Sequence, residues 1–495
     1  MALPAVVPCA ALFLPVIVLF WHGLGLRSWL AGAAEEGSCV GKCGLWTDTC
    51  WCDKSCEAYG NCCTDYAAAC APACPACHGY TCDEWIAWDP RYTCDSLTQM
   101  WGCDCSACLS CSAPPAVRPS NAATLRLFDA GELPGARCLD GSMAGYYFRA
   151  GDTERYLVFL EGGGWCYDPN CAAPTLHGTL QDCRSRSFGR LGSSMRWPAL
   201  QDSRLTGHLS ADPQENPVFH DWTLVYVPYC DGASFTGSRV IDGLHFRGTD
   251  ILNGVNSDLK AKTRIRDAKQ VVLSGGSAGA SAVYYHVDAF AEGLSLSRGE
   301  VVGIPDAGFF LDLRDKDGVD CWPNMMRSLF GIIGYTDLHS GCQQRFKSQP
   351  WKCLFPENYV DLIRSRLFAV NSFYDLSEFR YTLRLDCCPG GCSPSEKKCN
   401  RQELAIFHAM RSQHAEGWRR LAEKHGSGVW APACIAHTMA WGSWTNASWE
   451  VPAGSGNTMA AVVGSWLAKD GADASSFAYQ DEVAWPGNRP CAGDH

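Results

Sequence analysis

Ser277 lies in a glycine-rich turn whose residue types suit a catalytic serine. The segment Gly275–Gly279 has the pattern Gly-x-Ser-x-Gly, and it follows the mostly apolar run Lys269–Ser274. Residues Ala280–His286 come next and are able to start a helix. A strand, a tight turn and a helix in this order form a nucleophile elbow, which leaves the serine Oγ exposed at the edge of a sheet. The alternative is a tight turn in which Ser277 only caps the helix.

A serine nucleophile needs a base, and the base needs an orienting carboxylate. In α/β hydrolases the chain order is serine, then Asp or Glu, then histidine. Asp375 fits this order because it follows the apolar run Leu367–Val370 and a short polar turn. Asp306 is the rival acid, since it follows the run Val301–Ile304. The pattern favours Asp375 and leaves Asp306 open.

His437 is the predicted base. The histidines that follow Asp375 are His408, His414, His425, His437 and His495. The first three fall in or at the end of an expected helix over Leu404–His425, where a histidine usually packs or is solvated, and the last is the chain end. His437 instead follows Cys434 on a loop-like segment, and a disulfide at Cys434 would restrict that loop.

The negative oxygen that develops during ester hydrolysis needs hydrogen-bond donors already in place. Gly162–Gly164 directly follow the apolar run Tyr156–Leu160, and such glycine runs supply backbone amides in lipases and esterases. The predicted donors are the amides of Gly163, Gly164 and Ala278. A phosphate-binding loop is the alternative, but the segment lacks the Lys-Ser/Thr of a P-loop.

Unbroken apolar runs point to the elements that would position these residues. Short runs of this kind are typical of strands covered on both faces, as in a mostly parallel sheet flanked by helices. They predict an α/β-hydrolase-like fold over residues 123–495, as one large domain with insertions. The runs are Tyr156–Leu160, Leu224–Val227, Val271–Leu273 and Leu367–Val370.

Composition indicates an oxidising compartment. The 495 residues include 31 cysteines, which predicts disulfides made during secretion. Lys plus Arg is 41 and Asp plus Glu is 52, so the net charge of −11 disfavours binding to nucleic acid. Residues 1–34 are predicted to be a signal peptide, because an apolar run ends in the small residues Ala31–Ala34. The alternative is an uncleaved membrane anchor.

The cysteines that follow the predicted signal peptide divide into three groups, each of which contains an even number. Eight lie in residues 35–72, eight in residues 73–112, and fourteen from Cys138 to Cys491. Even groups predict internally bridged modules, with a proline-rich linker over residues 113–122. Zinc is the alternative partner of the clustered cysteines, but it would use only four ligands and leave others unpaired. We therefore expect no metal and no cofactor.

Residues 35–72 resemble the somatomedin B domain. The similarity rests on the Cys-x-Cys-Asp step at Cys50–Asp53 and on the pentapeptide Cys62–Tyr66. The resemblance implies four disulfides and a possible protein partner. The second cysteine module, residues 73–112, has a different spacing and suggests no function.

The large C-terminal region resembles the pectin acetylesterase family, which also includes the Wnt deacylase Notum. The resemblance implies a secreted, metal-independent carboxylic ester hydrolase with Ser277 as nucleophile, Asp375 as orienting acid and His437 as base. The motifs that carry it are Phe159–Cys166, Ser274–Gly279, Pro305–Asp312, Asn371–Asp375 and Cys434–His437.

The expected substrate is an O-acetyl ester of a polysaccharide. Gly164 resembles the plant pectin enzymes, whereas Notum has a bulkier residue there, and losing that bulk would reshape the acyl pocket. The alternatives are a lipid deacylase of a lipidated protein and a non-catalytic extracellular binding protein. The segment Leu376–Phe379 departs from the Trp-Gln that usually follows the acid in this family.

Overall fold

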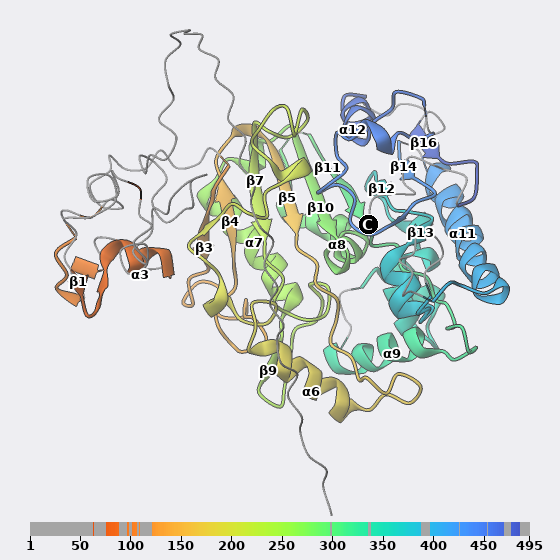
Figure 1. Cartoon of the computed structure of the whole chain (residues 1–495), viewed down its shortest axis with the longest axis horizontal. Coiled ribbons are helices and arrows are strands. Elements are labelled where there is room, and N and C mark those ends of the chain that lie inside the picture. Colours follow the sequence, from red (N-terminus) through yellow and green to blue (C-terminus); the bar gives the residue numbers. More distant parts are fainter. Residues whose placement is uncertain are drawn as a thin grey trace, which may run out of the picture.

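Ten strands form the central sheet, and most of them run parallel (Figure 1). The spatial order is β16-β14-β12-β11-β10-β5-β7-β4-β3-β6, with parallel pairing from β16 to β7 and antiparallel pairing from β7 to β6. The strands are β3 (Ala123–Leu127), β4 (Gly145–Arg149), β5 (Asp152–Leu160), β6 (Leu200–Gln201), β7 (Trp222–Val227), β10 (Gln270–Gly276), β11 (Glu300–Asp306), β12 (Phe368–Val370), β14 (Gly428–Ala431) and β16 (Ala478–Gln480). The predicted α/β-hydrolase-like class is confirmed.

The computed structural model describes residues 121–485, except 298, 335–337, 388–396, 425, 453 and 470–476, together with 63, 76–88, 97–98, 101–105 and 108. The predicted signal peptide at 1–34 lies outside the described residues. So do all of the somatomedin B-like module except Cys63, much of the second cysteine module, and the linker apart from its last two residues. Those boundaries stay predictions.

The predicted apolar runs became strands because each is buried on both faces. Every residue of β7 and β12 is buried, and so is the C-terminal part of β5. Continuous apolar sequence suits such strands, because helices cover both faces of a parallel sheet. At their carboxyl ends β5, β10 and β12 lead into the glycine loop, the serine turn and the acid turn, which therefore meet at one edge of the sheet.

Helices pack around this sheet (Figure 1). Helix α8 contacts β10, β11 and α7, while α11 contacts β13 and β14. Asn400 caps α11 together with Glu403, so this helix begins slightly before the predicted Leu404. The helices are α3 (Cys82–Trp88), α6 (Leu176–Ser187), α7 (Gly248–Lys262), α8 (Ala278–Leu294), α9 (Cys321–Ile333), α10 (Ser340–Arg345), α11 (Arg401–Ala422) and α12 (Met459–Leu467).

Three two-stranded sheets complete the regular structure of the described residues. They are β1 (Ala76–Cys77) with β2 (Tyr80–Thr81), β8 (Arg239–Ile241) with β9 (Leu244–Phe246), and β13 (Tyr374–Asp375) with β15 (Ile435–Ala436). The last pair lies at the predicted site, because β13 contains Asp375 and β15 directly precedes His437.

Disulfides hold both the large domain and the second cysteine module. In the large domain they join Cys138–Cys230, Cys166–Cys183, Cys171–Cys321, Cys342–Cys353 and Cys387–Cys399. In the second module they join Cys77–Cys103 and Cys82–Cys105. The one described cluster with metal-ligand geometry is Cys387, Cys399 and Glu403, and its two cysteines are bonded to each other.

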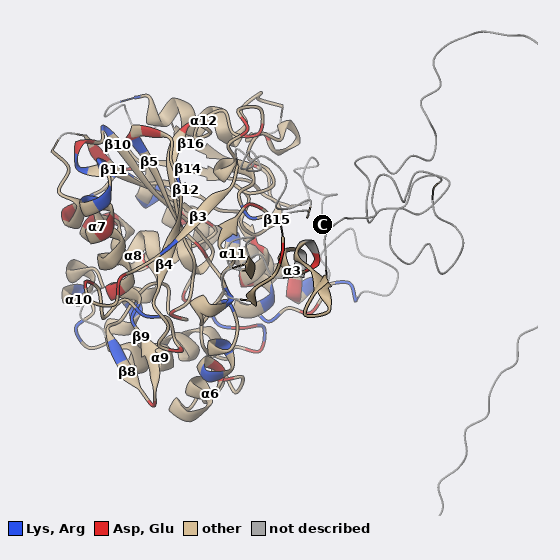
Figure 2. Cartoon of the chain, turned by 90° about the vertical axis from the view of Figure 1, so that its left-hand side faces the viewer, with Lys and Arg blue, Asp and Glu red and all other residues tan. Residues whose placement is uncertain are grey.

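Charged residues of both signs are interspersed over the large domain in the view of Figure 2. Within the described part of the chain, no helix combines the length and apolarity needed to cross a bilayer.

Candidate active site

Ser277 occupies a sharp turn between β10 and α8. Its backbone has φ 54° and ψ −124°, a conformation that non-glycine residues rarely adopt and that often marks a functional turn. A Cβ at Gly275 would lie 2.4 Å from the Gly279 carbonyl oxygen, and one at Gly279 would lie 2.1 Å from the Leu160 oxygen. Both positions therefore require glycine, so the predicted strand–turn–helix geometry is present.

Three predicted side chains meet at this turn. The His437 Nε2 atom lies 2.9 Å from the Ser277 Oγ. Its other ring nitrogen, Nδ1, lies 2.8 Å from Oδ2 and 3.0 Å from Oδ1 of Asp375. An ionised carboxylate only accepts hydrogen bonds, so Nδ1 carries the proton and Nε2 is free to accept from the serine hydroxyl. This arrangement can activate a serine.

Asp375 is held by backbone as well as by His437. The side chain is 1% exposed, and its Oδ1 accepts hydrogen bonds from the amides of Ser377 and Glu378 at 2.8 and 3.1 Å. Strand β13 pairs in parallel with β15, which places Asp375 opposite Ala436. The pairing brings the acid next to the histidine that follows Ala436. Cys434, which directly precedes β15, is disulfide-bonded.

Asp306, the rival acid, contacts a different part of the histidine loop. Its Oδ1 and Oδ2 accept hydrogen bonds from the amides of Met439 and Ala440 at 3.0 and 2.8 Å. Burial raises the pKa of Asp306 to about 6, although these amides oppose the shift. Asp306 thus anchors the turn after His437, whereas the His437 ring bonds to Asp375.

The environment of His437 suits a general base. Burial lowers its pKa, but the negative charge and hydrogen bond of Asp375 outweigh burial, and the net pKa lies above that of ordinary histidine. The ring is 21% exposed and packs near Phe310, with ring centroids 6.2 Å apart. It can therefore reach both the buried acid and an incoming substrate.

The other candidate histidines lie elsewhere. His408 contacts the hydroxyl of Tyr374 at 3.0 Å, and His414 is fully buried under the acid turn. His425 and His495 fall outside the described residues. His408 and His414 both lie on α11, as predicted, and neither forms a hydrogen bond with Ser277.

His414 and Glu378 form a buried pair that the sequence did not reveal. The His414 Nε2 lies 2.9 Å from the Glu378 Oε2, and the two side chains are 0% and 1% exposed. Nδ1 also faces an acceptor, the carbonyl oxygen of Phe373, at 3.3 Å. Burial lowers the pKa of His414, but the charge of Glu378 outweighs it and raises the pKa overall. Acceptors at both nitrogens favour the protonated form of the His414 ring.

The glycine loop places backbone amides beside Ser277. A Cβ at Gly162 would lie 2.9 Å from the Ser277 Cβ, and Gly164 has φ +69°. The amides of Gly163, Gly164 and Ala278 make no hydrogen bond with the other described residues. They are therefore available to a ligand at the serine.

Glu161 anchors the start of the glycine loop. This buried carboxylate pairs with Arg190 and Arg204, and it accepts a hydrogen bond from the Tyr229 amide at 3.1 Å. At the other end of the loop, the Trp165 indole donates to the Ser234 hydroxyl at 2.7 Å. The loop is thus held on both sides of its glycines.

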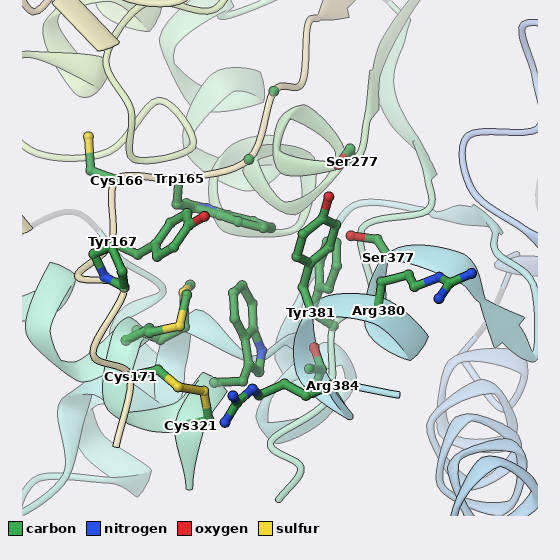
Figure 3. A pocket seen from close by; sticks show the side chains of 18 of the residues that line it. Trp165, Cys166, Tyr167, Cys171, Ser277, Cys321, Ser377, Arg380, Tyr381 and Arg384 are labelled. Atoms are coloured by element: carbon green, nitrogen blue, oxygen red, sulfur yellow. A yellow bond between two sulfur atoms is a disulfide. The ribbon is translucent and has the colours of Figure 1, made fainter. Parts of the chain in front are cut away.

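A cavity of about 720 Å³ opens in front of Ser277 and His437. Its apolar wall consists of Trp165, Phe310, Trp322, Met325 and Met326, and its polar residues include Arg186, Ser377, Arg380, Tyr381 and Arg384. In the view of Figure 3, Ser277 lies at one end and the Cys171–Cys321 disulfide at the other. The cavity can hold a substrate much larger than an acetyl group.

Two comparisons of sequence identify the family. The family model for pectinacetylesterase matches residues 118–492, and the somatomedin B domain model matches residues 37–73. The chain belongs to the pectin acetylesterase family. Its N-terminal segment matches a somatomedin B domain, as the cysteine spacing predicted. Both resemblances are therefore confirmed.

Members of this family with curated names fall into two groups. Pectin acetylesterase 5 of Arabidopsis thaliana is 31% identical over 367 residues, which cover 71% of this chain and 82% of the relative. Palmitoleoyl-protein carboxylesterase notum2 of Xenopus laevis is 30% identical over 315 residues, which cover 61% of this chain and 60% of the relative. Because both groups are esterases, the protein is a carboxylic ester hydrolase.

A solved structure supports the fold. The Wnt deacylase Notum from Drosophila superposes with a TM-score of 0.62, at 23% sequence identity, and covers 76% of this chain and 100% of the Notum chain. At this identity the likeness establishes a shared architecture and carries no conclusion about the substrate.

Proposed function

We propose that this pectin acetylesterase family member is a serine esterase in which Ser277 is the nucleophile, His437 the general base and Asp375 the orienting acid. One observation carries the proposal: the two ring nitrogens of His437 lie within hydrogen-bond distance of the serine hydroxyl and the buried carboxylate. Asp375 fixes the tautomer that leaves Nε2 able to accept a proton.

The reaction proceeds through an acyl-enzyme. His437 takes the Ser277 proton as Oγ attacks the ester carbonyl carbon, and the amides of Gly163, Gly164 and Ala278 bind the resulting oxyanion. His437 then protonates the leaving alcohol as the ester C–O bond breaks. Water repeats the sequence on the acyl-enzyme, which releases the acid and restores Ser277.

We propose an O-acetyl ester of a polysaccharide as the first substrate candidate. The Arabidopsis pectin acetylesterases support it, as does Gly164, which adds no side chain to the loop beside the serine. Arg380 also lines the cavity and forms no ion pair with another described residue. A cation in this position suits a polysaccharide that carries carboxylates.

A longer acyl ester is the second candidate, and the cavity favours it. Apolar side chains line much of a volume of about 720 Å³, which exceeds the needs of an acetyl group. Trp165 packs edge-to-face on Phe310 and Trp322, with ring centroids 5.0 and 5.1 Å apart. An apolar wall of this kind would stabilise a hydrocarbon chain. The relatives named palmitoleoyl-protein carboxylesterases agree with such a substrate.

The variant Ser277→Ala tests the mechanism. We expect it to abolish hydrolysis of p-nitrophenyl acetate, while secretion and the thermal melting temperature stay near wild type. A fluorophosphonate probe should label wild-type protein and leave the variant unlabelled. Undiminished turnover in the variant would reject Ser277 as nucleophile, and folded wild type that resists labelling would favour a binding protein without activity.

Acyl length separates the two substrate candidates. We expect a higher kcat/KM for p-nitrophenyl acetate than for the octanoate, measured with the same wild-type preparation. The variant Trp322→Ala removes part of the apolar wall and serves as a comparison, because the loss should affect a long bound acyl chain far more than an acetyl group. A marked preference for octanoate that Trp322→Ala weakens would replace the acetyl ester by a lipid ester.

We propose that the protein acts outside the cell and that the somatomedin B domain binds a protein partner. The disulfides of the large domain support secretion, because such bonds persist in oxidising compartments. Secretion of full-length protein into medium, with the residues before the somatomedin B domain removed, would agree with a signal peptide. Retention on the cell membrane would favour an anchor.

A further inference from the structure

Arg186 donates hydrogen bonds to the backbone of the glycine loop. Its two terminal nitrogens lie 2.9 Å from the carbonyl oxygen of Gly163 and 3.2 Å from that of Trp165. The guanidinium also lines the cavity in front of Ser277 and lies 6.0 Å from the Tyr229 ring centroid. Arg186 thus bridges two carbonyls in the segment that carries the proposed oxyanion donors.

The peptide between Gly163 and Gly164 connects Arg186 with the reaction. A trans peptide is planar, and its C=O and N–H groups point in opposite directions. When Arg186 holds the Gly163 carbonyl, the Gly164 N–H of the same peptide is turned to the other side. A charged donor on the carbonyl also polarises the peptide, which makes that N–H a stronger donor.

A disulfide restricts the position of the helix turn that carries Arg186. Arg186 lies in the last turn of α6, and Cys183 one turn earlier forms a disulfide with Cys166 in the glycine loop segment. Residues three apart on a helix lie on the same face. The disulfide and the guanidinium therefore tie one face of α6 to the loop.

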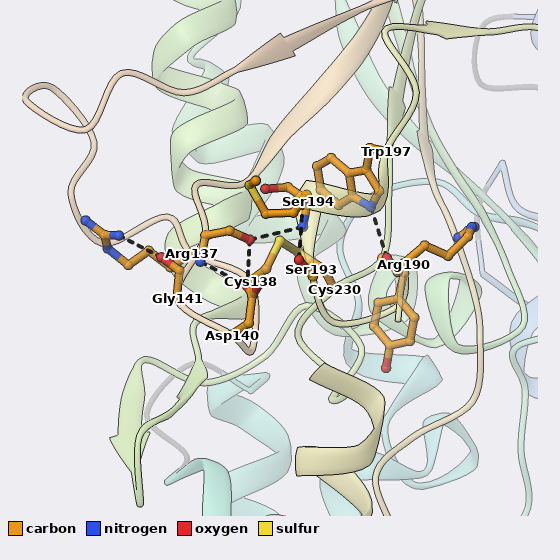
Figure 4. Close-up of a disulfide and its surroundings, with 12 residues drawn as sticks. Arg137, Cys138, Asp140, Gly141, Arg190, Ser193, Ser194, Trp197 and Cys230 are labelled. Carbon is orange, nitrogen blue, oxygen red and sulfur yellow. Dashed lines mark hydrogen bonds between the residues drawn. A yellow bond between two sulfur atoms is a disulfide. The ribbon is translucent and has the colours of Figure 1, made fainter. Parts of the chain in front are cut away.

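A second disulfide restrains the backbone to which the same segment is hydrogen-bonded. The Cys166 amide donates to the Gly232 carbonyl at 3.0 Å, and the neighbouring Cys230 is bonded to Cys138. Figure 4 shows this disulfide beside the segment that contains Arg190 and Trp197. The backbone that Arg186 contacts therefore has little freedom to move away from it.

The charge of Arg186 is not paired with a carboxylate among the described residues. In contrast, Arg184 on the same helix pairs with Asp242, and Arg190 pairs with Glu161. Arg186 instead donates its hydrogen bonds to neutral carbonyl oxygens at the edge of the cavity. Its positive charge is left to favour negative charge that develops nearby.

We propose that Arg186 is a positioning residue that orients and polarises the Gly163–Gly164 peptide, so that the Gly164 amide is aimed at the oxyanion. The inference rests on the proposed function, because it assumes that Ser277 attack produces an oxyanion at this loop. It predicts that Arg186 acts on the transition state and contributes little to binding of the ground-state ester.

The test compares Arg186→Gln with Arg186→Lys in the full-length secreted protein. We expect Arg186→Gln to lower kcat for p-nitrophenyl acetate about 10- to 100-fold, somewhat less than deletion of a whole oxyanion donor, while KM stays within about twofold. A trifluoromethyl ketone, which forms a tetrahedral oxyanion with the serine, should lose affinity by the same factor as kcat. Arg186→Lys should recover part of both, because it keeps the charge and one donor. Arg184→Gln is the matched control and should match wild type.

The outcomes separate this inference from the proposed function. If Ser277→Ala is inactive and Arg186→Gln keeps wild-type kcat and ketone affinity, only the role of Arg186 is rejected. A raised KM with unchanged kcat would also reject it, because Arg186 would then bind substrate. If Arg186→Gln does not fold, Arg186→Lys decides by the same split between kcat and KM. Activity retained in Ser277→Ala would instead reject the mechanism itself.

Discussion

The two sides of Ser277 are built from different kinds of groups. One side, called here the proton side, consists of the partly exposed ring of His437 and the buried side chains of Asp375, Asp306, Glu378 and His414. The other, the oxyanion side, consists of the backbone amides of Gly163, Gly164 and Ala278 together with the residues that hold them. A mutation can replace a side chain by one of similar shape, whereas it can only move a backbone amide and cannot remove it. The two sides should therefore fail in different ways.

Two carboxylates of the proton side have different hydrogen-bond partners. Asp375 and Asp306 are both buried after neighbouring strands, yet one bonds to the His437 ring and the other to the backbone that follows it. We infer from this difference that Asp375 orients the histidine ring, whereas Asp306 holds only the backbone that follows it.

The largest effect is expected from Asp375→Asn. The backbone amides of Ser377 and Glu378 hold the amide oxygen at the Oδ1 position, so the amide NH2 group faces Nδ1 of His437. A donor there favours the tautomer with the proton on Nε2, which cannot accept from Ser277. We expect kcat to fall about 10⁴-fold with little change in shape, as in other serine triads. Steady-state hydrolysis of p-nitrophenyl acetate measures this.

Asp306→Asn is the matched control for the acid. It leaves the His437 ring bonded to Asp375 and weakens only one of the two bonds to the Met439 and Ala440 amides. Its kcat should fall far less than that of Asp375→Asn. Equal losses in the two variants would contradict the division of labour and give Asp306 a share in orienting the histidine.

The next largest effect is expected on the oxyanion side, from Gly164→Ala. With φ at +69°, an added Cβ is strained by about 1–2 kcal/mol, and relief of that strain turns the peptide that bears the amide. Loss of one such donor lowers kcat about 10²- to 10³-fold. We expect a loss at the low end of this range, with KM nearly unchanged.

Gly318→Ala is the matched control, because it introduces a similar backbone strain outside the glycine loop. Gly318 has φ +77°, and no heavy atom lies within 4 Å of its added Cβ. It should lose similar stability in a chemical denaturation experiment and keep its kcat. A comparable loss of kcat in both variants would mean that strain alone, and not the amide, explains the effect.

The comparison also explains how much of the site was predictable. Ser277 and Asp375 each follow an apolar run, and His437 lies on a loop-like segment further along the chain, so residue type and chain order pointed to all three before their positions were known. Their meeting depends on the parallel sheet, which the unbroken apolar runs predicted correctly. The glycine loop was recognisable because close approach of backbone to the serine requires the absence of side chains.

Arg186, His414 and Glu378 could not be found in this way. Arg186 acts on carbonyl oxygens, which every residue has, so its partners leave no mark in the sequence. His414 and Glu378 are brought together by α11 packing over the acid turn, across a separation of 36 positions. An arginine or histidine on an amphipathic helix is ordinarily solvated or packed, and only the tertiary contacts distinguish these two.

The smallest effect on activity, but a large one on stability, is expected from His414→Gln. The change leaves Glu378 buried without its cation, and breaking a buried ion pair lowers the free energy of unfolding by about 3–5 kcal/mol. The Glu378 amide still donates to Asp375, so kcat should change less than in the two variants above. His408→Gln, on the same helix and partly exposed, is the control and should lose little stability.

The pH dependence distinguishes the ion pair from simple packing. The pKa of His414 is raised in the folded protein, so its contribution to stability is fully present below the ordinary histidine value of about 6.5. The contribution disappears as pH rises through the higher value of the folded state. Denaturant unfolding of wild type and His414→Gln should therefore differ most in mild acid and converge in mild alkali. A difference that is independent of pH would mean that His414 fills space under the acid turn without carrying a charge there.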